Sequence, residues 1–163
     1  MHTVTAAEGQ TKGETYAELA AQLRALMEGE DDFIANAANF SSLLFYSLPG
    51  LNWAGLYLLK GGGLVLGPFQ GRPACVRIAV GSGVCGTAAA GRRTVVVPNV
   101  HEFPGHIACD SASNSEVVVP LLKGGDLLGV LDLDSPDFGR FDEEDARGLE
   151  SLVRVLLGGG AFR

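Results

Sequence analysis

The chain has 163 residues, of which 47% are hydrophobic and 19% are charged. This length suits one domain with a real hydrophobic core, and the composition is typical of globular rather than disordered proteins. Lysine and arginine number 12 against 19 acidic residues, so the net charge of −7 argues against binding to nucleic acid or an anionic membrane. The apolar runs are far shorter than the roughly 20 residues of a membrane span, and residues 1–14 lack the apolar core of a signal peptide. We therefore expect a cytoplasmic protein.

Helices are predicted at both ends of the chain. The first follows a tail of residues 1–14 and carries apolar residues at helical spacing over residues 16–27. The second is expected after Asp31, a residue type suited to capping a helix N-terminus. Asp142 is expected to cap the last helix, whose first turn is acidic, as the helix dipole favours. Residues 158–163 are interpreted as a frayed C-terminus.

Short strands separated by glycine-rich turns occupy the middle of the chain. They are predicted at residues 52–59, 64–67, 74–80, 94–97, 117–122 and 127–134. The first two and the last two read as hairpins, and residues 81–91 read as a loop that opens into a short helix. Helices at both ends around hairpin-linked strands predict an α+β fold with a mainly antiparallel sheet.

Three cysteines come from three separate predicted elements: Cys75 from a strand, Cys85 from a glycine-rich loop and Cys109 from a long polar loop. An odd number without an export signal argues against a structural disulfide framework, which leaves buried free thiols, metal ligands or redox chemistry. Zinc would need His101 or His106 as a further ligand, and their spacing fits metal patterns poorly. Redox chemistry fits better, because one thiolate can attack while another resolves the sulfenic acid as a disulfide. We expect no metal and no cofactor.

The loop around Cys109 concentrates polar side chains, including Asp110 and Ser111. It would suit a solvated surface segment, but long structured loops in compact domains are more often functional. Before it, residues 81–86 spell G-x-G-x-x-G, which in a dinucleotide site requires a parallel βαβ unit. Because the surrounding strands read as hairpins, we interpret these glycines as a close backbone approach that presents amides and Cys85 to a small ligand.

Acidic and aromatic side chains are predicted to share faces of the sheet. Strand alternation places Asp132 and Asp134 on one face, and Glu116 directly precedes the neighbouring strand. This face is either solvated or lines a pocket, and in a pocket the adjacent carboxylates would repel and favour a bound cation such as an ammonium group. Trp53 and Tyr57, four residues apart on one strand, either pack in the core or wall a pocket for a methyl-sulfur group.

Five segments resemble the free methionine-(R)-sulfoxide reductases, which are single GAF-domain enzymes. They are NWAG at residues 52–55, LGPFQG at 66–71, GVCGT at 83–87, HIACDSASNSE at 106–116 and GVLD at 129–132. The run around Cys109 is highly specific, because generic GAF sensor domains lack it. The resemblance covers about residues 33–157. It implies one GAF domain over residues 15–157, with a six-stranded antiparallel sheet flanked by helices.

The resemblance also implies a reaction. The substrate would be free L-methionine (R)-sulfoxide, the reductant thioredoxin, and the assembly often a homodimer. The family's three cysteines match Cys75, Cys85 and Cys109. Cys109 is the expected nucleophile and Cys75 its partner in the main disulfide, while Cys85 lies close to the substrate and is assigned the attack in some members.

The family's substrate-binding residues also have counterparts in this chain. Its acidic residues match Glu116, Asp132 and Asp134, and its aromatic pocket matches Trp53 and Tyr57. The alternative function is a non-catalytic GAF sensor for a small molecule, which would keep the pocket but need no second thiol.

Overall fold

The computed structural model describes residues 9–106 and 110–159. In chain order its elements are α1 (Lys12–Met27), α2 (Phe33–Ser47), β1 (Trp53–Lys60), β2 (Gly63–Gly71), β3 (Arg77–Ala79), α3 (Gly83–Gly91), β4 (Val95–Val97), the 3₁₀ helix η1 (Val100–Glu102), β5 (Ser115–Lys123), β6 (Asp126–Ser135) and α4 (Glu143–Gly159). None of the helices in these ranges is long and apolar enough to cross a membrane.

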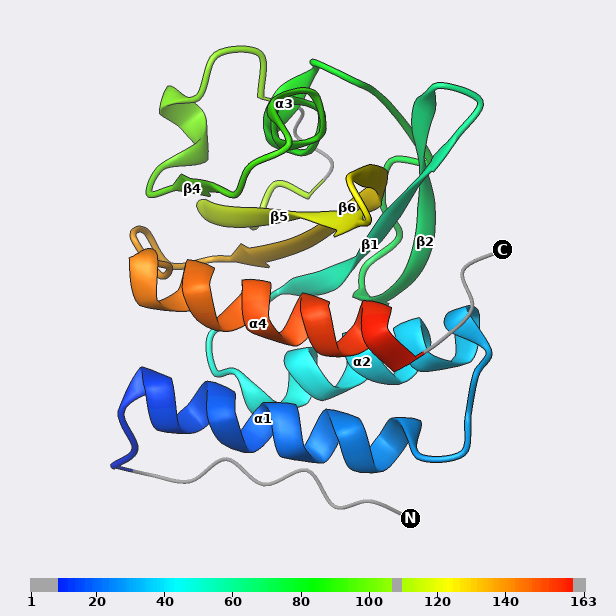
Figure 1. The fold of residues 1–163 in the computed structure, drawn as a ribbon. Helices are drawn as coiled ribbons and strands as arrows, with labels where there is room; N and C mark the ends of the chain where they lie inside the picture. Colours follow the sequence, from blue (N-terminus) through cyan, green and yellow to red (C-terminus); the bar gives the residue numbers. More distant parts are fainter. Residues whose placement is uncertain (1–8, 107–109, 160–163) are drawn as a thin grey trace.

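The six strands form one antiparallel sheet in the order β3-β2-β1-β6-β5-β4. Two hairpins, β1–β2 and β5–β6, meet along the β1–β6 pair at the centre of the sheet. Helices α1, α2 and α4 lie on one side of the sheet, while α3 and η1 lie on the other (Figure 1). The predicted α+β fold with a six-stranded antiparallel sheet is confirmed.

The side of the sheet that faces α1, α2 and α4 carries the main hydrophobic core. Leu131 and Leu133 of β6 and Val117 and Val119 of β5 are buried in it. Because side chains alternate along a strand, the residues between them point toward α3 instead. The β5–β6 hairpin thus contributes aliphatic side chains to one face and is free to carry polar ones on the other.

The observed helix starts differ slightly from the predicted ones. Asp32, rather than Asp31, caps α2 by accepting a hydrogen bond from the backbone N–H of Ala35 at 2.8 Å. The first helix begins at Lys12, so it includes residues 12–14 of the predicted tail.

At the other end of the chain, the predicted cap of the last helix is confirmed. The side chain of Asp142 accepts from the N–H groups of Glu144 and Asp145. Helix α4 continues to Gly159, which includes residues 158–159 of the predicted frayed end.

Cys75 lies in the loop before β3, not on a strand as predicted, because β3 extends over Arg77–Ala79 alone. Pro73 has no N–H to donate to a neighbouring strand. The carbonyl of Cys75 accepts a hydrogen bond of 2.8 Å from the side-chain hydroxyl of Tyr57 and not from the backbone N–H of a neighbouring strand. Backbone pairing with β2 begins one residue later, at Val76, whose carbonyl accepts from the N–H of Leu66 at 2.8 Å.

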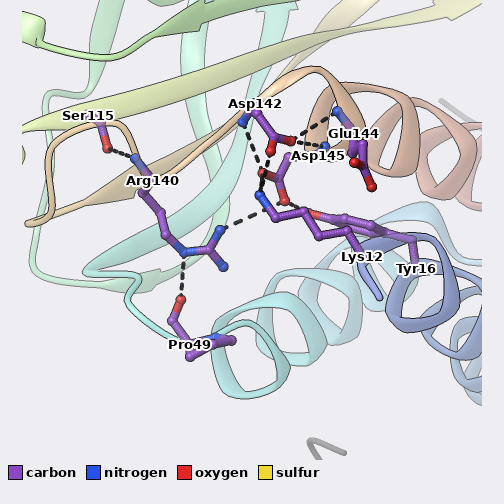
Figure 2. A network of polar contacts seen from close by, with 8 residues as sticks. All are labelled: Lys12, Tyr16, Pro49, Ser115, Arg140, Asp142, Glu144 and Asp145. Atoms are coloured by element: carbon purple, nitrogen blue, oxygen red, sulfur yellow. Dashed lines mark hydrogen bonds and ion pairs between the residues drawn. The ribbon is translucent and has the colours of Figure 1, made fainter. Parts of the chain in front are cut away.

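A buried carboxylate, Asp145, joins α1 to α4 (Figure 2). One oxygen accepts from Lys12 Nζ at 2.7 Å, and the other accepts from the Tyr16 hydroxyl at 2.7 Å and lies 3.8 Å from an Arg140 guanidinium nitrogen. Burial, followed by the charge of Asp145, raises the pKa of Tyr16, so its hydroxyl remains a donor. Lys12 Nζ also donates to Asp142 Oδ2 at 2.9 Å. This hydrogen bond is the main reason that the pKa of Asp142 falls to about 2.

Arg140 extends this network to the sheet. Its Nε donates to the carbonyl of Pro49 at 2.9 Å, and its backbone N–H donates to Ser115 Oγ at 3.3 Å (Figure 2). Ser115 begins β5 and directly precedes Glu116. The helical layer is thereby anchored beside the first acidic residue of the opposite face.

Candidate active site

A pocket lies on the α3 side of the sheet. Its lining comprises Trp53, Tyr57, Arg72, Pro73, Ala74, Ile78, Ser82, Gly83, Val84, Cys85, His106, Asp110, Ser113, Glu116, Asp132 and Asp134. These residues come from β1, β3, β5, β6, the start of α3 and two loops. Every described residue of the predicted site except Cys75 is among them.

The strand register brings the three acidic residues together. Glu116 of β5 lies opposite Asp134 of β6, and Asp134 also lies opposite Trp53 of β1. Asp132 is two residues from Asp134 and so shares its face. Glu116 is 6% exposed and Asp132 5%, while Asp134 is partly buried. The predicted shared face is confirmed, and the alternative of a solvated face is excluded.

Burial in this pocket favours the neutral forms of the acids. Burial, followed by the charges of Asp132 and Asp134, raises the pKa of Glu116 well above its ordinary value. Burial, followed by the charge of Asp132, does the same for Asp134, and burial raises the pKa of Asp132. Among the described residues, no lysine or arginine forms an ion pair with any of the three. The pocket can therefore hold a proton near neutral pH or receive a cation from a ligand.

Cys85, in the first turn of α3, is a free thiol beside these acids. It is 4% exposed, and its Sγ lies 3.9 Å from Glu116 Oε2. Burial, followed by the charges of Asp132 and Glu116, raises the pKa of this thiol well above its usual range. This raised pKa favours the thiol form of Cys85 over the thiolate.

The glycine pattern around Cys85 serves close packing. A Cβ on Gly86 would lie 2.4 Å from the carbonyl oxygen of Ala79, so only glycine allows the start of α3 to approach the end of β3 this closely. The sheet around this segment is antiparallel, without the parallel βαβ unit of a dinucleotide site. The close approach is between α3 and β3, and the presentation of backbone amides to a small ligand stays a prediction.

An aromatic wall forms one side of the pocket. Trp53 stacks on Tyr57 with ring centroids 5.9 Å apart and on Phe69 at 5.2 Å, and its Nε1 donates to the carbonyl of Arg72 at 3.1 Å. A Cβ on Gly55 would lie 2.3 Å from Phe69 Cβ and 2.8 Å from the Trp53 ring, so glycine makes room for this stack. Trp53 and Tyr57 share a face as predicted, and they both pack in the core and line the pocket.

Part of the polar loop is tied to the residue that precedes the central strand β1. Asn52 Nδ2 donates to Asp110 Oδ2 at 3.1 Å and to Ser113 Oγ at 3.0 Å, which holds both of these residues at the pocket. The predicted nucleophile, Cys109, lies outside the described residues. Its described neighbour Asp110 lines the pocket.

The two candidate zinc-ligating histidines have different surroundings. His106 lines the pocket, where burial and the nearby His101 lower its pKa. His101 is exposed, and its Nε2 lies 2.9 Å from Asn114 Oδ1. Within the described ranges, the potential metal-ligating neighbours of Cys85 are acidic side chains. Neither histidine is among them.

Several site residues were missed by the sequence reasoning. Phe69 and Asn52 belong to motifs quoted for the resemblance, and Arg72 directly follows one of these motifs, but none of the three was identified as a site residue. The sequence does contain a sign of the role of Phe69. Gly55 lies opposite Phe69 in the β1–β2 pair, and it has no side chain to block the stack of Phe69 on Trp53. The role of Arg72 depends on its backbone carbonyl, which no residue type reveals.

Comparisons with known proteins agree with this geometry. The GAF domain family model matches residues 15–156. Free methionine-R-sulfoxide reductase of Escherichia coli (strain K12) is 56% identical over 145 residues, which cover 89% of this chain and 88% of that protein. The protein of the same name from Saccharomyces cerevisiae is 41% identical over 153 residues, or 89% and 85% of the two chains. An X-ray structure of free methionine-R-sulfoxide reductase from Neisseria meningitidis with its substrate has a TM-score of 0.90 and 43% identity, covering 96% of this chain and 93% of that one. The chain therefore belongs to the GAF-domain family of free methionine-(R)-sulfoxide reductases.

Proposed function

We propose that this protein reduces free L-methionine (R)-sulfoxide to L-methionine through a cysteine sulfenic acid and an intramolecular disulfide, which thioredoxin reduces. The observation that carries the proposal is the row formed by Glu116, Asp132 and Asp134 beside the Cys85 thiol. The Escherichia coli and Saccharomyces cerevisiae relatives named as free methionine-R-sulfoxide reductases support the same reaction.

The reaction balances in three steps. A cysteine thiolate attacks the sulfoxide sulfur, and the oxygen, with one proton from an acid, ends on the cysteine as a sulfenic acid while methionine leaves. The methionine sulfur gains two electrons and the cysteine sulfur loses two. A second thiol then attacks the sulfenic acid to form a disulfide and release water. A thioredoxin dithiol returns the two electrons and leaves as its own disulfide.

The attacking cysteine is assigned to Cys109 and the resolving cysteine to Cys75. The high pKa of the buried Cys85 thiol supports this division, because a neutral thiol is the poorer nucleophile. Cys85 remains the alternative nucleophile, since a bound ammonium group would relieve the negative field that keeps it protonated. The two assignments differ in which single variant stops the first step.

The three carboxyl groups have two roles in this proposal. A protonated carboxyl among Glu116, Asp132 and Asp134 supplies the proton to the sulfoxide oxygen, and the remaining charge pairs with the substrate ammonium group. The rings of Trp53 and Tyr57 would pack against the methyl-sulfur end. An amino acid inside a peptide has no free ammonium group, which accounts for a preference for the free amino acid.

A coupled assay tests the reaction. Reduced thioredoxin, thioredoxin reductase and NADPH are supplied with racemic free L-methionine sulfoxide, and NADPH consumption is followed to completion. Consumption that stops at half of the sulfoxide supplied is expected for a stereospecific reductase. No consumption above the enzyme-free control would contradict the proposal and favour a small-molecule sensor.

The resolving step has its own test. Protein treated with substrate, alkylated and digested without reductant should yield a crosslinked peptide containing Cys75 and Cys109. A dominant link between Cys85 and Cys109 would show that the resolving cysteine was assigned wrongly. The Cys75–Cys109 disulfide can form only when the Cα atoms of these two residues are within about 7 Å of each other.

The cycle suits the cytoplasm, where thioredoxin is kept reduced, and we propose that location for the protein. The family resemblance leads us to propose a homodimer as well. Light scattering at assay concentrations should give twice the monomer mass, and a monomer of full activity would exclude a functional need for the dimer.

A further inference from the structure

We propose that Cys85, Glu116 and Asp132 form a binding site for a thiophilic divalent cation of the Zn²⁺ type. The bound cation would prevent the substrate from binding in the pocket. The ion would be a reversible inhibitor and not a resident cofactor. The cation site rests on the geometry of these three side chains alone, whereas its inhibitory effect rests on the proposed reductase function.

The three side chains have metal-ligating geometry. One ligand atom from each lies within 4.8 Å of the other two, and Cys85 Sγ is 3.9 Å from Glu116 Oε2. In a tetrahedral zinc site with Zn–S of about 2.3 Å and Zn–O of about 2.0 Å, such atoms are about 3.5 Å apart. A contraction of at most about 1.3 Å between ligand atoms would seat the ion. The ligands come from α3, β5 and β6, elements that pack against one another, so the site is largely formed in advance.

A second observation indicates that the site needs a cation. Asp132 Oδ1 is buried and has no hydrogen-bond partner among the described residues. An unpaired carboxylate oxygen in the interior is costly unless a positive group reaches it. No cationic side chain within the described ranges forms an ion pair with this acidic row, so a bound cation would supply a positive charge that these residues do not.

The donor set selects the class of ion. Mg²⁺ and Ca²⁺ prefer sites made entirely of oxygen, whereas one thiolate and two carboxylates suit Zn²⁺ and Co²⁺. Three protein ligands leave a fourth position for water in the pocket. On binding, the Cys85 thiol gives its proton to solvent and becomes a ligating thiolate. The bound ion then occupies the place of the substrate ammonium group and ties up a carboxyl group proposed to donate the proton.

Cobalt titration tests the site without using enzyme activity. In a Cys75→Ser, Cys109→Ser double variant, Cys85 is the only thiol of the chain. Reduced, metal-free double variant titrated with Co²⁺ should bind one ion and develop a thiolate-to-cobalt charge-transfer band, which added Zn²⁺ should abolish. No band, or a band that survives Cys85→Ser, would overturn the proposal.

A matched pair of variants distinguishes ligation from a general negative field. Asp132→Asn in the double-variant background should weaken Co²⁺ binding by at least about tenfold, as losses around metal sites usually do. Asp134→Asn removes a neighbouring charge of the same row but no ligand, and should weaken it far less. Glu116→Gln provides a second ligand variant if Asp132→Asn folds poorly, as judged by circular dichroism. Equal losses in the Asp134 variant and in the ligand variants would overturn the site.

The inhibitory consequence is measured separately on the unaltered chain. Zn²⁺ should raise the apparent KM for free methionine sulfoxide in single-turnover assays, and a chelator should reverse the effect. Co²⁺ binding in a protein that reduces no sulfoxide would refute the proposed function and leave the cation site intact. Sulfoxide reduction in a protein that shows no cobalt band would refute the cation site and leave the proposed function intact.

Discussion

Buried carboxylates lie on both sides of the sheet, and their surroundings are opposite. Asp145, on the helical side, contacts Lys12, Tyr16 and Arg140 (Figure 2). Glu116 and Asp132, on the α3 side, face other acids and the Cys85 thiol. A carboxylate whose charge is paired stabilises one fold, whereas acids left without a cation form a site that a positively charged ligand can complete.

The difference matters because the two groups are joined through β5. Arg140 belongs to the first group and donates to Ser115, the residue before Glu116. The paired group therefore anchors the strand that carries the unpaired one. We infer that stability on the helical side offsets the repulsion concentrated on the other side, a division typical of functional sites. Four predictions test this comparison, beginning with the largest expected effect.

Substitution of the proposed nucleophile should affect activity far more than loss of a contact to Asp145. Cys109→Ser is expected to abolish the release of methionine even in a single turnover, because no sulfenic acid can form. Tyr16→Phe, which removes one hydrogen bond on the helical side, should retain turnover. Methionine is quantified after mixing excess reduced enzyme with substrate. Full single-turnover activity in Cys109→Ser, with loss in Cys85→Ser, would move the nucleophile to Cys85.

Removal of the substrate's positive charge should expose the need of the pocket for a cation. N-acetyl-methionine sulfoxide is expected to have a kcat/KM at least about 100-fold below that of the free amino acid, since an acylated nitrogen leaves the buried acceptors unpaired. Asp134→Asn and Glu116→Gln should raise KM for the free substrate. A larger fall in kcat for either variant would mark that residue as the proton donor. Similar turnover of both sulfoxides would refute this reading of the carboxylates.

Neutralising one acid on each side of the sheet should change stability in different directions. Asp145→Asn is expected to lower the free energy of unfolding by about 1.5–3 kcal/mol, because charged hydrogen bonds to a buried group are lost. Asp132→Asn should leave the free energy unchanged or raise it, because it removes repulsion within the acidic row. Urea unfolding measures both variants. Equal destabilisation by the two would show that the acidic row is as well paired as Asp145.

The pH dependence of stability should follow the raised pKa values of the pocket. A carboxyl whose pKa is higher in the folded state holds more protons there than in the unfolded chain, so the free energy of unfolding falls as pH rises above the ordinary carboxyl range. Glu116→Gln should make this decline shallower. Asp142 has the opposite sign, since its folded pKa of about 2 gives stability that is lost only as pH falls toward that value. The test is to measure urea midpoints of the unaltered protein and of Glu116→Gln between about pH 5 and pH 8 and to compare the two slopes. An unchanged slope in Glu116→Gln would contradict the assignment.

Much of the architecture and part of the site could be read from the sequence because they depend on local pattern. Strand alternation separated Leu131 and Leu133 from Asp132 and Asp134, and the structure confirms the two faces. The helix cap at Asp142 follows from the hydrogen-bonding capacity of one side chain. The Cys109 segment was recognisable by its resemblance to a family, a signal that needs no coordinates.

Tertiary structure alone decided the electrostatics. Cys85 and Glu116 are 31 residues apart, and their contact depends on how α3 packs across β5, which no local spacing encodes. The position of Cys75 in a loop was also decided by contacts at a distance, since its carbonyl bonds to Tyr57 of β1. Whether a carboxylate is buried alone or beside a lysine depends on which elements meet in space. For that reason the same residue type became a structural anchor at Asp145 and a reactive group at Glu116.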